Sequence, residues 1–163
     1  MNRNDILDLY RYNDWANARV IAVLQQIPNE ALHRDLGGSF RSIRDVLAHI
    51  VSAEWIWLER WTGNNPQAIP EWVATGSVPD LIDRLHSTEN ARRTFLEELP
   101  PSDLDRDLTI RYISGRQDTQ RLSVFLMHAA NHSTYHRGQL AHMLRQTGNV
   151  PPSTDYVVYK AAQ

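Results

Sequence analysis

The chain lacks cysteine throughout its 163 residues, which excludes disulfide bonds, thiolate metal ligands and a cysteine nucleophile. It has no apolar run long enough to span a bilayer, and its start, MNRNDILDLYRYNDW, has no apolar signal core. No sign of charge dominates, because 17 Lys and Arg face 19 Asp and Glu, which gives no electrostatic attraction for nucleic acid or an anionic membrane. We therefore expect a cytoplasmic protein that binds a small molecule, with no nucleic-acid or membrane partner.

Apolar residues recur with helical spacing in four segments, and helix-breaking residues separate these segments. Pro28 follows the first segment, and Pro100 follows the third. Ser42 and Asp45 form a variant of the capping box at the start of the second segment. The four predicted helices cover residues 5–27, 43–61, 79–99 and 122–146.

One stretch, DLTIRYISGRQDTQRLS at residues 107–123, has β character, because apolar and polar residues alternate before a Ser-Gly turn signal. The sequence therefore predicts an all-α protein, a four-helix bundle with a short β-like or irregular crossover before the last helix. A chain that is 42% hydrophobic and shows no repeat, linker or low-complexity tract indicates a single domain over residues 1–163.

Three histidines lie four residues apart within the last predicted helix, in the stretch HAANHSTYHRG. At 100° per residue, His136 lies close to the centre of the apolar stripe, His132 within about 50° of it and His128 about 90° away. Two buried imidazoles on one stripe compete for polar partners, and a shared metal ion would satisfy both. We expect His132 and His136 to be metal ligands.

A third ligand would come from another helix, and two histidines compete for this role. His49 lies in the strongly apolar segment DVLAHIVSAEWIWLERW, where a neutral imidazole needs a polar partner. His86 lies on the flank of the third predicted helix. The apolar surroundings favour His49, although spacing alone leaves His86 open.

Other polar residues also interrupt the predicted core stripes. Asn13, Asn17 and Glu54 could each support a metal site or line a pocket, or could form hydrogen bonds between helices or lie on the rim. Arg92 could face an anionic substrate in a pocket wall, or belong to a loosely packed surface helix, which we favour. Trp15 and Trp55 could form the interface of a homodimer, or cover the second side of the bundle.

Three segments resemble the DinB family of metal-dependent four-helix proteins, which includes the YfiT-like hydrolase candidates. They are LYRYNDWANARV, SFRSIRDVLAHIVSAEWIWLERW and HAANHSTYHRGQLAHMLRQTG, whose His-x-x-x-His pair leads into Arg-Gly-Gln. The resemblance implies a divalent metal held by His49, His132 and His136. We expect the residues that support these ligands or line the pocket to be His128, Asn13, Asn17, Gln139 and Arg92.

Three imidazoles leave coordination positions open, as in catalytic metal sites, and they suit zinc first, with nickel or iron also possible. The better-understood branches of the family that the chain resembles use low-molecular-weight thiols. We therefore predict a thiol-dependent transferase or isomerase, whose thiol comes from outside because the chain has no cysteine. The alternatives are a hydrolase that activates water, with Glu54 as the catalytic base, and a non-catalytic metal-binding or ligand-binding bundle.

Overall fold

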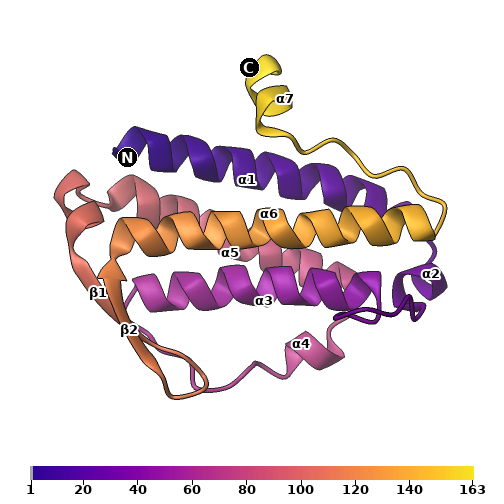
Figure 1. The fold of residues 1–163 in the computed structure, drawn as a ribbon, viewed down its shortest axis with the longest axis horizontal. Helices are drawn as coiled ribbons and strands as arrows, with labels where there is room; N and C mark the ends of the chain where they lie inside the picture. The colour runs from indigo at the N-terminus through magenta and orange to yellow at the C-terminus, as the bar shows by residue number, and fades with distance from the viewer. Residues whose placement is uncertain (1) are drawn as a thin grey trace.

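Four long helices form the body of the computed structural model, which describes residues 2–163 (Figure 1). Shorter elements connect them or follow them, and the only sheet within residues 2–163 is a two-stranded hairpin before the last long helix. The prediction of an all-α bundle with a β-like crossover is therefore confirmed. The long helices are α1 (Arg3–Leu24), α3 (Ile43–Trp61), α5 (Val78–Glu98) and α6 (Leu122–Gln146). The short elements are α2 (Asn29–His33), α4 (Trp72–Thr75), η1 (Pro101–Asp105), β1 (Asp107–Arg111), β2 (Gln117–Arg121) and α7 (Tyr156–Ala161).

Side-chain caps explain where three of the four long helices, α1, α3 and α5, begin. Ser42 Oγ accepts a hydrogen bond from the Asp45 backbone N–H at 3.2 Å, as its sequence position predicted. At α1 the cap is Asn2, whose side chain and that of Asp5 form a reciprocal capping box. The helix therefore starts before the predicted residue 5, and it ends at Leu24 rather than at residue 27.

The crossover is an antiparallel hairpin in which Asp107 pairs with Arg121 and Arg111 with Gln117. Leu108 and Ile110 alternate with exposed residues and are buried on the side that faces the bundle. Because β2 leads directly into α6, the hairpin fixes the start of the helix that carries the histidines.

The core of the bundle has two large apolar clusters with a polar layer between them, and a small third cluster joins Tyr12 and Ala16 of α1 to Tyr159 of α7. One cluster joins the end of α1 to the starts of α3 and α5 and the end of α6. The other joins the opposite ends of the same four helices. Buried polar side chains occupy the level between these clusters: Asn13, Asn17, Glu54, Thr88, Glu89, Arg92, Ser133, His136 and Arg137. Within residues 2–163, no helix is both long enough and apolar enough to cross a membrane.

Candidate metal centre

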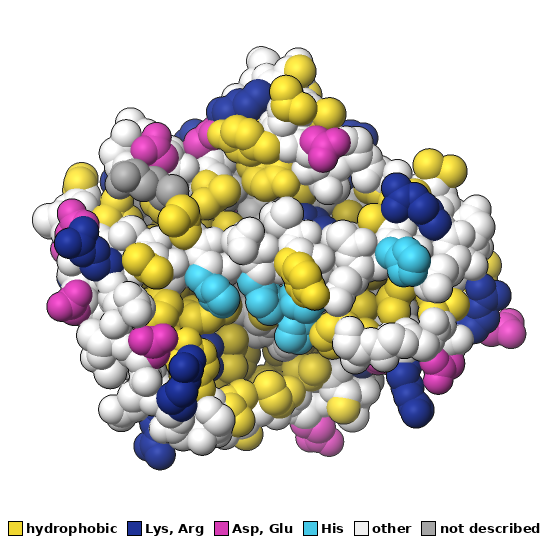
Figure 2. Space-filling view, in the orientation of Figure 1, with side chains coloured by type: hydrophobic (Ala, Val, Ile, Leu, Met, Phe, Trp, Pro, Cys, Tyr) yellow, Lys and Arg dark blue, Asp and Glu magenta, His cyan; other side chains and the backbone are white. Residues whose placement is uncertain are grey.

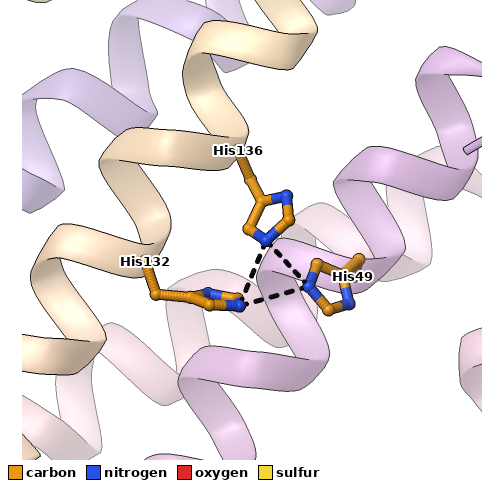
Figure 3. Close-up of side chains that lie close together, drawn as sticks. All are labelled: His49, His132 and His136. Carbon is orange, nitrogen blue, oxygen red and sulfur yellow. Dashed lines mark hydrogen bonds between the residues drawn. The ribbon is translucent and has the colours of Figure 1, made fainter. Parts of the chain in front are cut away.

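Three histidines converge at the level of this polar layer, one from α3 and two from α6 (Figure 3). His49 Nε2 lies 3.3 Å from His132 Nε2 and 3.0 Å from His136 Nε2. The Nε2 atoms of His132 and His136 lie 3.1 Å apart. One ring nitrogen of each histidine thus points toward a common centre.

The packing of two antiparallel helices brings these rings together. In Figure 1, α3 and α6 lie side by side and run in opposite directions. The spacing of four residues places His132 and His136 on neighbouring turns of one face of α6, opposite His49. His136 is buried and the other two rings are half-buried, so the cluster lies at the edge of the core.

The hydrogen bonds of the cluster leave its centre rich in acceptors. The His136 Nδ1–H donates to Gln139 Oε1 at 2.7 Å, because the amide oxygen can only accept. In this tautomer the His136 ring presents its Nε2 lone pair to the other two histidines. His132 Nδ1 is buried with no hydrogen-bond partner within residues 2–163. Three neutral imidazoles cannot satisfy all three contacts by sharing protons, whereas a central cation satisfies every lone pair at once.

The electrostatics also fit a cation. Burial lowers the pKa of His49 to about 4, and the neighbouring His136 contributes to this shift. Burial likewise lowers the pKa of His132 to about 4, with contributions from the adjacent histidines. Both rings are therefore neutral near pH 7, which is the form that binds metals.

The spacing of the nitrogens suits a first-row divalent ion. An ion about 2.0–2.1 Å from each of three tetrahedrally placed nitrogens would hold those nitrogens about 3.3 Å apart. The three observed separations are 3.0, 3.1 and 3.3 Å. An all-nitrogen set fits zinc, nickel or iron without choosing among them.

A pocket of about 220 Å³ opens beside the cluster, between α3, α6 and the loop that carries Ile69 and Pro70. His49 and His132 form part of its wall. His128 also lines it, with its ring centre 4.9 Å from that of Trp57. His128 thus lies in the pocket and outside the converging group, where the sequence analysis placed it. Figure 2 shows the histidines along α6 at the rim of a hollow with mostly hydrophobic walls.

Glu54 lies in a separate network of buried polar groups. Its Oε1 accepts hydrogen bonds from Asn13 at 2.8 Å, Asn17 at 3.1 Å and Ser133 at 3.0 Å, and its Oε2 binds Arg92. Burial alone would raise the pKa of Glu54, but Arg92 and the two asparagines outweigh it and lower the pKa to about 2. A carboxylate that is so weakly basic and fully engaged is a poor catalytic base. Asn13 and Asn17 form hydrogen bonds between helices, which is one of the interpretations that their sequence positions allowed.

The favoured interpretation of Arg92, as part of a loosely packed surface helix, was wrong, whereas a role in the wall of a substrate pocket stays a prediction. Arg92 is 1% exposed and is absent from the pocket beside the histidines. Its guanidinium pairs with Glu54 and Asp14 instead, and Cζ lies 4.8 Å from the ring centre of Tyr10. Arg92 faces the core because it neutralises carboxylates inside the bundle.

On α6, two members of this network, Ser133 and Arg137, were not anticipated from the sequence. Arg137 Nη1 donates to Asn13 Oδ1 at 2.6 Å and to Asn17 Oδ1 at 2.8 Å. Each missed residue directly follows a histidine of the cluster, so it points about 100° further round α6, toward α1. The position of each residue directly after a histidine of the cluster is the sequence signal that could have identified it.

The two tryptophans considered for a dimer interface have partners within the chain. Trp15 lies 5.5 Å from Tyr159 of α7, measured between ring centres, and Trp55 lies 6.1 Å from Trp72 of α4. Both tryptophans therefore cover the outside of the bundle. A homodimer stays a prediction.

Comparison with known proteins agrees with this architecture. The model of the DinB family matches residues 1–163. A relative called Protein DinB, from Bacillus subtilis strain 168, is 30% identical over 158 residues, which cover 93% of this chain and 91% of the relative.

Solved structures share the fold at lower identity. A DinB-like protein from Bacillus cereus is 21% identical, with a TM-score of 0.60 over 86% of this chain and 91% of its own. A second DinB-like protein, from Bacillus subtilis, is 17% identical, with a TM-score of 0.65 over 90% of this chain and 96% of its own.

Proposed function

The chain belongs to the DinB family, and from that premise we propose that it is an enzyme dependent on a divalent metal held by His49, His132 and His136. The observation that carries this proposal is the convergence of three Nε2 atoms, all 3.0–3.3 Å apart, beside an open pocket. A metal with three protein ligands and accessible remaining positions is the pattern of catalytic rather than structural sites.

The residues around the cluster have distinct roles in this proposal. When bound, a divalent ion supplies Lewis acidity, which lowers the pKa of a thiol or water that it coordinates. Gln139 holds the ring of His136 in the tautomer that directs Nε2 to the centre. Burial and the nearby Arg60 lower the pKa of His128, so His128 is neutral near pH 7 and can accept a proton in the pocket.

The composition of the pocket supports thiol chemistry as the reaction. None of the described residues that line it is a carboxylate, and Glu54 is engaged by four donors outside it. A thiol needs less help from a base than water does, because its unperturbed pKa is near 8.5 rather than 15.7. We infer that the chain transfers or uses a low-molecular-weight thiol supplied from outside.

Hydrolysis is the second candidate function, and the position of His128 is the observation that favours it. A neutral imidazole in the pocket could serve as the general base for water that a carboxylate would otherwise provide. In the third candidate, a binding protein, the same metal would be present without turnover.

Metal analysis of protein without a histidine tag tests the ligand set. We expect close to one divalent ion per chain, lost in His49→Ala, His132→Ala and His136→Ala. The matched controls His128→Ala and His142→Ala should retain it, and His142 is exposed on the same helix. Loss of metal in His128→Ala would contradict the assignment.

Spectroscopy of the cobalt-substituted protein then separates the reactions. Thiol use predicts a sulfur-to-cobalt charge-transfer band when a small thiol is added. Turnover of ester or amide substrates without any spectral response to thiols would favour hydrolysis. A bound metal with neither response would favour a binding protein.

A further inference from the structure

Arg60, in the last turn of α3, is a buried cation without an anionic partner. It is 5% exposed, and its Nε is buried with no hydrogen-bond partner within residues 2–163. Its Cζ lies 4.9 Å from the ring centre of Trp57 and 5.1 Å from that of Tyr112. These contacts use the face of the guanidinium and leave its N–H edge for hydrogen bonds.

The other buried arginines of the described chain are all hydrogen-bonded. Arg92 pairs with two carboxylates, and Arg137 donates to the side-chain oxygens of two asparagines. Arg44 donates twice to the Gly76 carbonyl, at 2.7 and 3.2 Å. Burial of a charge is costly unless the charge is paired, so Arg60 stands apart.

Arg60 lines the same pocket as the histidine cluster. It follows His49 by eleven residues, which is close to three helical turns, so both lie on one face of α3. The intervening wall is mostly apolar and includes Ile56, Trp57 and Ile69. The pocket therefore has lone pairs of histidine at one end, a cation at the other and apolar side chains between them.

From this arrangement we propose that the pocket binds a small molecule whose carboxylate is held by Arg60 while its other end reaches the histidine cluster. The second half of this statement rests on the metal site proposed above. A guanidinium edge matches the planar carboxylate with two parallel hydrogen bonds. The volume of about 220 Å³ admits a small metabolite and lies below the usual range for drug-sized ligands.

A matched pair of thiols tests the proposal. The probes are 3-mercaptopropionate and 3-mercapto-1-propanol, titrated into the cobalt-loaded protein while the charge-transfer band is followed. Hydrogen bonds to a charged group predict that the carboxylate probe binds about tenfold tighter or more. Arg60→Gln should remove this preference and leave the affinity for the neutral thiol unchanged. Arg60→Lys retains the positive charge but not the planar set of N–H donors, so it should keep part of the preference for the carboxylate probe.

The controls separate failure of this proposal from failure of the metal site. Equal affinity of wild-type protein for both thiols, or a preference that survives in Arg60→Gln, would overturn the carboxylate assignment while the metal proposal stands. If no cobalt binds, or if Arg60→Gln does not fold, an NMR titration of the metal-free wild-type protein tests the carboxylate assignment instead. A shift of the Arg60 Nε–H resonance on titration with propionate, larger than with 1-propanol, supports the proposal, and an unmoved resonance contradicts it.

Discussion

Two polar regions occupy the same level of the bundle, and they differ in how their hydrogen bonds are completed. Around Glu54, side chains of all four long helices meet, and the carboxylate accepts bonds from four of them. Around His49, His132 and His136, three lone-pair atoms face one another, and among the described residues only Gln139 supports a ring from outside. The Glu54 carboxylate finds all its partners within the chain, whereas the three histidine nitrogens form a centre that suits a cation.

The difference identifies what each region does. Buried charges that neutralise one another, as Arg92 does with Glu54 and Asp14, hold the helices in one arrangement without offering a reactive group. Neutral nitrogens that converge at the edge of the core offer binding capacity. Polarity inside a bundle is therefore evidence for a site only after its internal hydrogen bonds have been counted.

Removal of the central carboxylate should have the largest effect on stability. Glu54→Ala leaves Arg92 buried with one partner fewer and removes an acceptor from three other side chains. We expect a loss of about 3–5 kcal/mol in the free energy of unfolding, measured with urea on metal-free protein. Glu59→Ala, more exposed on the same helix, should cost less than about 1 kcal/mol. Similar losses in the two variants would show that the network is not structural.

A change at Glu89 should alter how stability depends on pH. Burial raises the pKa of Glu89 to about 7, although a hydrogen bond from Asn17 opposes the shift. Because this folded-state pKa exceeds the unfolded value, the stabilising contribution is complete below about pH 4.5 and is lost as the pH rises through about 7. The loss amounts to up to about 3 kcal/mol.

Glu89→Gln should therefore flatten the stability profile between pH 5 and pH 8, and should be more stable than the parent at pH 8. Urea unfolding at several pH values measures this. Glu98→Gln, exposed at the end of the same helix, should keep the parental profile. A steep profile that persists in Glu89→Gln would place the titrating group elsewhere.

The histidine cluster should affect stability only when metal is present. Zinc at a free concentration of 100 times its Kd should stabilise the wild-type protein by about 2.7 kcal/mol. His132→Ala should lose this gain while changing the metal-free protein little, since the ring lies at the half-buried edge. Unfolding with and without a chelator measures both quantities. A large loss in the metal-free variant would mean that the ring is mainly structural.

Gln139 should have the smallest effect, on affinity rather than on ligand number. Gln139→Ala removes the acceptor for His136 Nδ1–H, and loss of such a supporting contact typically weakens metal binding by about 10–100-fold. Competition with a chromophoric chelator measures the affinity. Gln146→Ala, exposed at the end of α6, is the matched control and should bind zinc like the parent. An unchanged affinity for zinc in Gln139→Ala would contradict the role of Gln139 in orienting His136.

The sequence predicted the bundle, the hairpin crossover and the side chains that converge. Helical periodicity shows on which side of its helix a residue lies, and that was sufficient for His132 and His136. His49 was favoured over His86 by its apolar surroundings and by the family resemblance, because spacing alone left both open. Periodicity does not show which residue lies opposite across an interface. The pairing of Arg92 with Glu54 and Asp14, and the contributions of Ser133 and Arg137, therefore emerged only from the packed helices.

X-ray absorption at the zinc edge, on zinc-loaded protein without a histidine tag, tests the central claim most directly. The account predicts three imidazole nitrogens at about 2.0–2.1 Å, and two in His49→Ala if any zinc is retained. A spectrum with at most one imidazole, or one that is unchanged in His49→Ala, would contradict it.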